Sequence, residues 1–103
     1  MRTIAVVAGG DSSEYGISVR SAEGVVEALK ERYHLYIIVI RGSQWYWEDP
    51  KGRVFTIDKN DFSLVTDDSR IRFDAVFVAI HGTPGENGLL QGYFDMIGIP
   101  YTS

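Results

Sequence analysis

Apolar residues in this chain gather in three short, nearly unbroken runs. The runs span residues 3–8, 35–40 and 73–80, and they are rich in β-branched or aromatic side chains. An apolar run of this length is typical of a strand that is buried on both faces, as the strands of parallel sheets are. The pattern therefore predicts three parallel strands.

Segments with helical spacing separate or follow these runs. In residues 13–32 the apolar positions fall on one stripe and the charged positions on another, as in a helix with one buried face. The stripe consists of Ile17, Ala22, Val25, Val26 and Leu29. We expect a second helix at residues 88–97, which Gly98 ends in the left-handed conformation and Pro100 keeps from continuing. A short last strand is predicted at residues 99–102.

The middle of the chain has a different pattern. Two strand-like segments, residues 44–48 and 53–57, flank a turn-forming Asp-Pro-Lys-Gly sequence at 49–52 and predict a β-hairpin. We interpret the three consecutive aromatic residues at 45–47 as a packing face of this hairpin rather than as a ligand site. The polar residues 58–72 predict a surface connection, with one short turn around residues 61–65.

Together these elements predict the α/β class. The expected architecture is a small, doubly wound, mostly parallel sheet with a β-hairpin insertion, in one domain over residues 1–103. Ligands of such sheets bind at the carboxyl ends of the strands. Glycines follow two of these ends, at Gly9-Gly10 and at Gly82. Because parallel strands end at the same edge of a sheet, we expect both glycine-containing loops to face one crevice.

Composition narrows the class of protein further. A chain of 103 residues with 45% hydrophobic content can form one small domain with its own core. Its net charge is −4 and its basic residues are scattered, which argues against a nucleic-acid-binding surface. It has no cysteine, which excludes disulfides and thiolate metal sites. Without a signal-peptide pattern or an apolar run of about 20 residues, the sequence predicts a cytoplasmic protein that does not contact membranes.

The segment from His81 to Gly88 is the strongest candidate for chemistry. Gly82, Gly85 and Gly88 allow sharp turns and a close approach of the backbone to a ligand, and loops held on a rigid scaffold commonly carry function. His81 has two interpretations. It is either a structural residue at a strand end or an imidazole that donates to a carboxylate or phosphoryl oxygen near neutral pH.

Two carboxylates accompany this histidine. Glu86 either binds backbone N–H groups of its own loop, which we favour, or orients His81. Glu14 stands at the start of the first predicted helix, where a carboxylate complements the helix dipole or binds a cation such as the ammonium group of an amino acid. The loop around Glu14 matches neither the dinucleotide-binding fingerprint nor the Walker phosphate-binding loop.

Three motifs carry a resemblance to a known family. They read Gly9-Gly10-x-Ser12-x-Glu14-x-x-Ile17-Ser18-x-x-Ser21, His81-Gly82-x-x-Gly85-Glu86-x-Gly88-x-x-Gln91-Gly92 and Gly98-Ile99-Pro100-Tyr101-Thr102. In this order they resemble the N-terminal domain of D-alanine–D-alanine ligases, which are ATP-grasp enzymes. The resemblance covers essentially the whole chain, although the hairpin region is least diagnostic. It implies a Rossmann-like fold of the kind that precedes the ATP-grasp domains.

The resemblance also implies roles for individual residues. Glu14 would hold the ammonium group of the first D-alanine, and Ile17 would line the pocket for its methyl group. His81 would lie near the carboxylate of this substrate, orienting it and stabilising charge as it becomes an acyl phosphate. Glu14 and His81 are thus the expected catalytic residues. The loop-shaping residues would be Gly82, Gly85, Glu86 and Gly88.

The chain departs from the family pattern at two positions. Asn87 stands where the family usually has aspartate, and Gly16 stands where an acidic residue is common. Asn87 keeps the size and capping ability of aspartate, so we expect the loop to keep its shape. Gly16 is expected to loosen the start of the first helix.

The resemblance implies a larger enzyme. The ATP-grasp domains, about two thirds of a family member, would bind ATP and Mg²⁺ (or Mn²⁺), and we expect this fragment to bind neither. The full-length protein would be a homodimeric D-alanine–D-alanine ligase of peptidoglycan precursor synthesis and cell wall biogenesis, with D-alanine as substrate. The isolated fragment is expected to fold without having ligase activity.

Other functions stay open at this point. D-alanine–D-lactate ligases share the first two motifs, and the residues that separate the two activities would follow Ser103. A stand-alone, flavodoxin-like binding domain without catalysis is a second alternative. A structural domain that dimerises through its first helix or its hairpin is a third.

Overall fold

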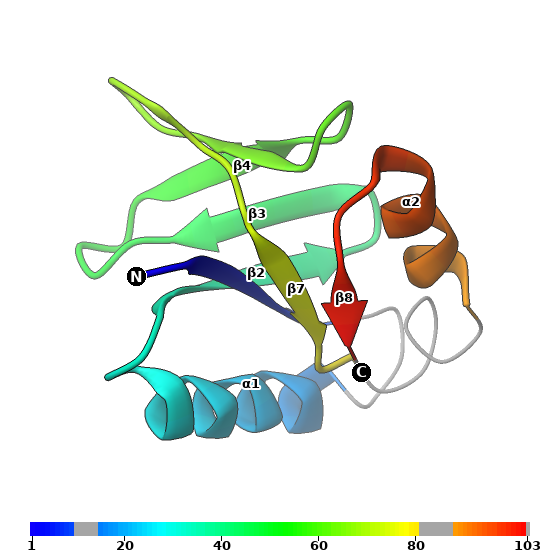
Figure 1. Ribbon diagram of the computed structural model, residues 1–103. Coiled ribbons are helices and arrows are strands. Elements are labelled where there is room, and N and C mark those ends of the chain that lie inside the picture. The colour runs from blue at the N-terminus through cyan, green and yellow to red at the C-terminus, as the bar shows by residue number, and fades with distance from the viewer. Residues whose placement is uncertain (10–14, 81–87, 103) are drawn as a thin grey trace.

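The computed structural model describes residues 1–9, 15–80 and 88–102 (Figure 1). Within these ranges eight strands form one sheet, in the order β6-β5-β4-β3-β2-β1-β7-β8, accompanied by two helices. The elements are β1 (Thr3–Gly9), α1 (Tyr15–Leu29), β2 (His34–Arg41), β3 (Gln44–Glu48), β4 (Val54–Asp58), β5 (Ser63–Val65), β6 (Arg70–Ile71), β7 (Ala75–Val78), α2 (Leu89–Ile97) and β8 (Tyr101–Thr102). The chain therefore has a mixed α/β fold.

The three predicted buried strands lie side by side and are parallel. β1 pairs with β2 on one side and with β7 on the other, so that Val6 stands between Ile37 and Phe77. β8 continues the parallel part beyond β7. The initial strand–helix–strand unit and the short last strand are thus confirmed.

The other half of the sheet is antiparallel and corrects the prediction of a mostly parallel sheet. Five consecutive strands form an antiparallel meander, from β2 through β3, β4 and β5 to β6. The predicted hairpin, β3 and β4, lies in the middle of this meander. At the hairpin turn Asp49 accepts hydrogen bonds from the backbone N–H groups of Lys51, at 2.9 Å, and Arg53, at 2.8 Å. In the described ranges three strand pairs are parallel and four are antiparallel, so the sheet is mixed.

The prediction of a polar surface connection at residues 58–72 is wrong. This segment holds β5 and β6, and within it Phe62 and Leu64 are fully buried. Phe62 also has a positive φ of 57°, which is rare for a bulky residue. Strands of three and two residues are too short to give a periodic signal, and charged residues surround the two buried side chains in the sequence. A pattern-based analysis therefore missed β5 and β6, although it predicted β2 and the hairpin of β3 and β4.

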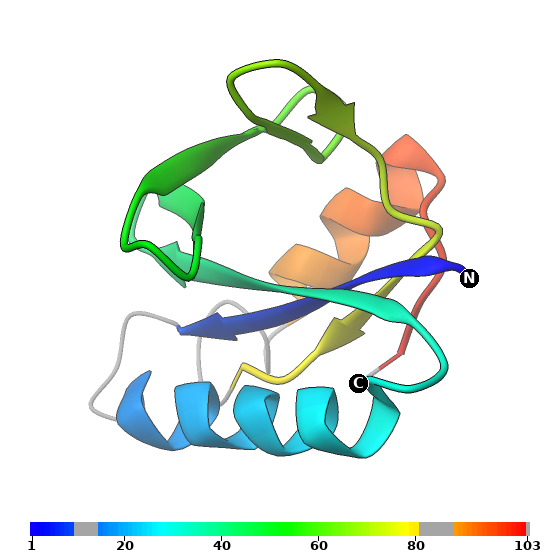
Figure 2. The same ribbon diagram turned by 90° about the vertical axis from the view of Figure 1, so that its left-hand side faces the viewer.

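The two faces of the sheet carry separate cores. On one face Val6 and Ala8 of β1 pack with Ala22 of α1. On the opposite face Ala5 and Val7 belong to a larger core that α2 and the meander cover. Figure 2 shows α1 along one face of the central strands and α2 beyond the other. Alternate residues of one strand thus serve both cores, as the two-residue period of a strand requires.

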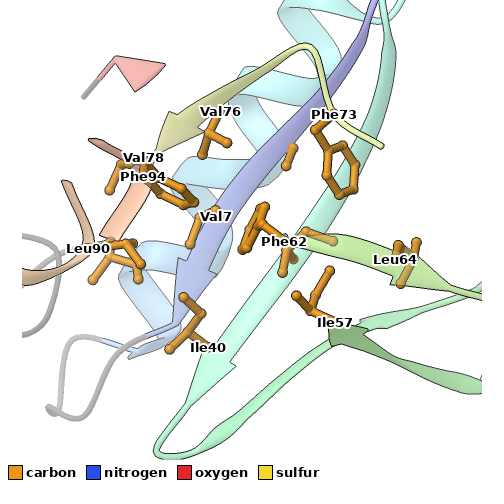
Figure 3. Packing of buried hydrophobic residues seen from close by; sticks show 13 residues of the cluster. Val7, Ile40, Ile57, Phe62, Leu64, Phe73, Val76, Val78, Leu90 and Phe94 are labelled. Atoms are coloured by element: carbon orange, nitrogen blue, oxygen red, sulfur yellow. The ribbon is translucent and has the colours of Figure 1, made fainter. Parts of the chain in front are cut away.

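Phe62 lies in the middle of the larger core, among side chains from several elements (Figure 3). Its ring packs edge-on against Phe94 of α2, with centroids 4.9 Å apart, and against Trp45 of β3, at 5.9 Å. Trp47 packs against Tyr36 with centroids 5.2 Å apart. The prediction that the hairpin aromatics form a packing face is therefore confirmed for the two tryptophans.

Both ends of α2 depend on glycine. Gly88 precedes the helix with φ of 82° and Gly98 ends it with φ of 77°. After the helix the N–H group of Ile99 donates to the carbonyl of Phe94 at 3.1 Å. The predicted left-handed termination at Gly98 is confirmed.

Exposed charges hold the last two strands of the meander together. Asp61 accepts hydrogen bonds from the Ser63 hydroxyl at 2.6 Å and from the Arg72 guanidinium at 2.7 Å. These bonds, that of Ser63 first, hold the pKa of the Asp61 carboxyl below its ordinary value of 3.8. A carboxyl whose pKa is lowered by folding stabilises the fold above its unfolded pKa and loses this effect as the pH falls through its folded pKa.

We predict that Phe62→Ala lowers the free energy of unfolding by about 3–5 kcal/mol, because it leaves a cavity in the larger core. Val54→Ala is the control, since Val54 is 56% exposed and its truncation should cost less than about 0.5 kcal/mol. Urea unfolding followed by tryptophan fluorescence measures both values. Equal losses in the two variants would contradict the placement of Phe62.

We also predict that Asp61→Asn destabilises the chain at neutral pH and that this difference shrinks in acid. The difference should begin to fall near pH 3.8, the ordinary pKa, and disappear below the folded pKa, where the wild-type carboxyl is protonated as well. Urea unfolding at a series of pH values measures it. Asp68→Asn, at an exposed position, should change stability little at any pH. A difference independent of pH would contradict the assignment.

Candidate functional site

The two sequence motifs place most of their residues in the loops that follow β1 and β7. Five predicted site residues lie outside the described part of the chain: Glu14, His81, Gly82, Gly85 and Glu86. Ile17 and Gly88 lie within it. What the structure describes is the scaffold on which the two loops stand, namely the ends of the strands and the start of each helix.

The two loops leave the sheet from neighbouring strands at the same edge. The pairing of β1 with β7 continues to Val7 and Val78. One residue further, the N–H group of Ala79 donates to the carbonyl of Val7 at 2.8 Å. The expectation that both glycine-containing loops start at one edge is therefore confirmed. The crevice between them involves residues 10–14 and 81–87, which lie outside the described residues, and it stays a prediction.

Gly9 allows β1 and β2 to approach each other closely at this edge. Its φ is 106°, and a Cβ atom at this position would collide with the backbone carbonyl oxygen of Ile40. A larger residue would force apart two strands that are paired up to this point, Gly9 opposite Ile40. The first glycine of the motif is thus required by its positive φ and by the packing of the two strands.

Ser18 connects the start of α1 to the ends of β1 and β7. Its hydroxyl accepts a hydrogen bond from the N–H group of Gly9 at 3.0 Å and donates one to the carbonyl of Ala79 at 2.8 Å. The side chain is fully buried. Ser18 belongs to the first of the three motifs, but no role was predicted for it. The available signal was its helical spacing to Ala22, which makes Ser18 a hydroxyl within the apolar stripe.

The two described site residues stand beside the loops. Ile17, in the first turn of α1, is 50% exposed, so its apolar side chain is available to a ligand at this edge. Gly88 takes the left-handed conformation at the start of α2, and its carbonyl accepts a hydrogen bond from Gly92 at 2.9 Å. The role of Ile17 as a pocket residue is not tested by this placement.

The hydroxyl of Tyr93, which has a raised pKa, belongs to α2 and lies outside the two motif loops. Burial raises the pKa of the Tyr93 hydroxyl to about 12, with the nearby carboxylates of Asp61 and Asp58 adding to the shift. This hydroxyl donates to the carbonyl of Lys59 at 2.5 Å. The arrangement joins α2 to the meander. It stabilises the fold and has no evident chemical role.

A hollow of about 480 Å³ lies on the β3–β4 hairpin and is separate from the ends of β1 and β7. Tyr46, Val54 and Thr56 contribute to its wall, together with Lys59. Trp45 borders this hollow as well as packing against Phe62, whereas Trp47 packs against Tyr36. The Lys59 ammonium donates to the carbonyl of Ser43 at 2.6 Å, so it is already engaged within the fold.

The donors of the described chain do not fit a metal centre. Among residues 1–9, 15–80 and 88–102, no group of three histidine, cysteine, aspartate or glutamate side chains is arranged to hold a metal ion. Within the same ranges no helix is long and apolar enough to cross a membrane.

Glycine-containing loops at the carboxyl edge of an α/β sheet define a class of ligand-binding domains. The family described as D-ala D-ala ligase N-terminus matches residues 3–103 of the chain. The chain belongs to this family.

Related proteins are similar over almost the whole chain. The chain is 54% identical over 103 residues to the D-alanine–D-alanine ligase of Phocaeicola vulgatus. This match covers 99% of the chain and 32% of that protein. The identity to the D-alanine–D-alanine ligase of Bacteroides thetaiotaomicron is 52%, over 98% of the chain and 32% of that protein. The chain thus spans about a third of the length of these relatives.

Solved structures support the fold. D-alanyl-alanine synthetase A of Vibrio cholerae matches with a TM-score of 0.83 and 32% identity, over 98% of the chain and 30% of that structure. The VanG D-Ala:D-Ser ligase of Enterococcus faecalis matches with a TM-score of 0.78 and 31% identity, over 97% of the chain and 34% of that structure.

We predict that Gly9→Ala destabilises the chain by about 2–5 kcal/mol, from backbone strain at a positive φ together with the collision at Ile40. Gly52→Ala is the matched control. Gly52 also has a positive φ, 84°, but a Cβ there would meet no atom within 4 Å, so only the strain of about 1–2 kcal/mol remains. Thermal or urea unfolding measures the difference, and equal losses would contradict the close approach of β1 and β2.

Proposed function

We propose that this chain is the substrate-binding N-terminal domain of an ATP-dependent D-alanine–D-alanine ligase. The family match over residues 3–103 carries the proposal. The position of the two motif loops at neighbouring strand ends supports it, because a small substrate held by both loops needs them side by side. The full-length enzyme would act in the cytoplasm, in peptidoglycan precursor synthesis and cell wall biogenesis.

The domain holds the first D-alanine by its two charged ends. Glu14 binds the ammonium group and His81 lies at the carboxylate, while Ile17 lines the pocket for the methyl group. The exposed position of Ile17 at the start of α1 supports its part. Gly82, Gly85, Glu86 and Gly88 shape the second loop, and the left-handed φ of Gly88 is consistent with such a turn.

The contribution of these residues is orientation and electrostatic stabilisation. In the ligase reaction the carboxylate of the first D-alanine takes a phosphoryl group from ATP and becomes an acyl phosphate. ADP is released in this first step. The amine of the second D-alanine then attacks the acyl carbon and loses a proton, and phosphate leaves as the amide bond forms. His81 stabilises the charge at the carboxylate during activation, and Glu14 keeps the ammonium end in place. No covalent intermediate with the protein is required.

The rest of the full-length protein supplies the ATP and Mg²⁺ (or Mn²⁺) sites. The chain spans about a third of its relatives, which supports this division of the sites. The fold then corresponds to a doubly wound, Rossmann-like pre-ATP-grasp domain, a view that the helices on opposite faces of the parallel strands support. We also propose that the full-length enzyme is a homodimer.

A second candidate differs only in the second substrate. The similar structure of VanG is that of a D-Ala:D-Ser ligase, and D-alanine–D-lactate ligases share the motifs of this chain. In each case the first substrate is D-alanine, so the role of this domain is the same. The second substrate is selected by residues beyond Ser103.

We predict that, in the full-length protein, Glu14→Gln and His81→Ala each lower kcat/KM for D-alanine about 10- to 100-fold. Loss of one hydrogen bond to a charged group costs about 1.5–3 kcal/mol, and 1.4 kcal/mol corresponds to about tenfold. Steady-state release of phosphate measures the effect. His34→Ala is the control, because His34 is exposed at the start of β2. Wild-type kinetics in both site variants would show that the assignment is wrong.

We further predict that the chain of residues 1–103 alone releases no phosphate from ATP in the presence of D-alanine. The longer protein should restore this activity. Phosphate release by the purified fragment, free of contaminating ligase, would contradict the assignment of the ATP site to other domains.

A further inference from the structure

The Ser18 hydroxyl takes the place of a backbone hydrogen bond between two strands. The parallel pairing of β1 with β7 ends with the bond from the Ala79 N–H to the Val7 carbonyl, at 2.8 Å. In a parallel ladder the next bond would run from the N–H of Gly9 to the carbonyl of Ala79. Instead, the Gly9 N–H donates to Ser18 Oγ at 3.0 Å, and the Ser18 hydroxyl donates to the Ala79 carbonyl at 2.8 Å.

An inserted hydroxyl separates the strand ends while it keeps them bonded. Two consecutive hydrogen bonds span a longer distance than the single bond that they replace, so β1 and β7 diverge at Gly9 and Ala79. Both backbone groups remain satisfied, which their burial requires. A helix residue therefore fixes how far apart the strands end and where the two motif loops begin.

We propose that Ser18 is a positioning residue, which sets the separation and orientation of the two loops that bind the substrate. The inference rests on the proposed function in one respect, namely that Glu14 and His81 bind opposite ends of one D-alanine. Glu14 stands five residues after Gly9 and His81 two residues after Ala79. The distance between the two loops must match the length of the amino acid that they bind. A misplacement of about 1 Å can cost about 100-fold in rate.

The surroundings of Ser18 favour a small side chain with both a donor and an acceptor. The neighbouring core on this face contains the buried alanines Ala8, Ala22 and Ala79. Alanine at position 18 would leave the Gly9 N–H and the Ala79 carbonyl without the hydroxyl that now satisfies them. Cysteine would keep a weak donor and a weak acceptor in a side chain of similar size.

The first test uses amide hydrogen exchange in the chain of residues 1–103. In Ser18→Ala we expect the exchange of the Gly9 amide to rise at least tenfold relative to that of Val6, which lies deeper in the same strand. Ala22→Gly is the matched control, because Ala22 lies one turn further along the buried face of α1. We expect Ala22→Gly to lower global stability and to leave the ratio of the two exchange rates unchanged. The same change of this ratio in both variants would overturn the proposal.

The second test uses steady-state kinetics of the full-length protein that contains this domain. In Ser18→Ala we expect the KM for the first D-alanine to rise about 10- to 100-fold while the KM for ATP stays the same, and Ser18→Cys should recover part of the loss. Ala22→Gly should change neither KM. A wild-type KM for D-alanine in Ser18→Ala, despite an altered Gly9 exchange ratio, would reduce Ser18 to a structural role and overturn the proposal.

The two tests separate failure of this inference from failure of the proposed function. If the wild-type full-length protein joins no D-alanine, the proposed function fails. The exchange ratio then still decides whether Ser18 controls the strand ends. If the wild type is active and the ratio is unaffected by Ser18→Ala, the inference fails and the proposed function stands.

Discussion

The pairing of one buried strand, β1, is the constraint on which the rest of this structure depends. β1 is bonded in parallel to β2 and to β7, and its alternate residues enter the cores on both faces of the sheet. Its carboxyl end is fixed from two sides. Gly9 admits the carbonyl of Ile40 on one side, and the Ser18 hydroxyl bridges to Ala79 on the other. The places where both motif loops begin follow from this pairing.

The antiparallel meander helps to cover one face of the sheet, which a short chain cannot cover with helices alone. α2 has only nine residues and covers one part of its face. The meander covers another part, because Phe62 and Leu64 reach the same core as Phe94 of α2. In the strand order the meander extends from β2 to β6, away from β7 and β8, and Figure 1 labels its strands β2, β3 and β4. The carboxyl ends of β1 and β7 remain available to the two loops.

How far the sequence predicts the structure depends on the length of each signal. Long apolar runs and a helical stripe predicted β1, β2, β7 and α1, because a wrong register would expose whole buried faces. β5 and β6 are too short to give a period, and their buried residues stand among charges. The bridging role of Ser18 depends on the spatial meeting of Gly9 and Ala79, 70 residues apart in the chain.

The functional residues were predicted from motif resemblance more than from physics. A histidine and a glutamate in glycine-containing loops indicate a ligand site, but they do not by themselves identify D-alanine. The described residues form the scaffold on which the proposed ligands of D-alanine, Glu14 and His81, are carried. The hydrogen bonds of Ser18 to Gly9 and Ala79 indicate a positioning role that neither the motifs nor the resemblance had suggested.

The most direct test of the central claim is an NMR titration of the full-length protein with D-alanine, using L-alanine as the control ligand. The account predicts that D-alanine shifts the amide signals of residues 10–14, Ile17 and residues 81–87, and that L-alanine shifts them far less. Shifts confined to the hollow around Tyr46 and Lys59, or equal responses to the two enantiomers, would contradict a substrate site at the carboxyl ends of β1 and β7.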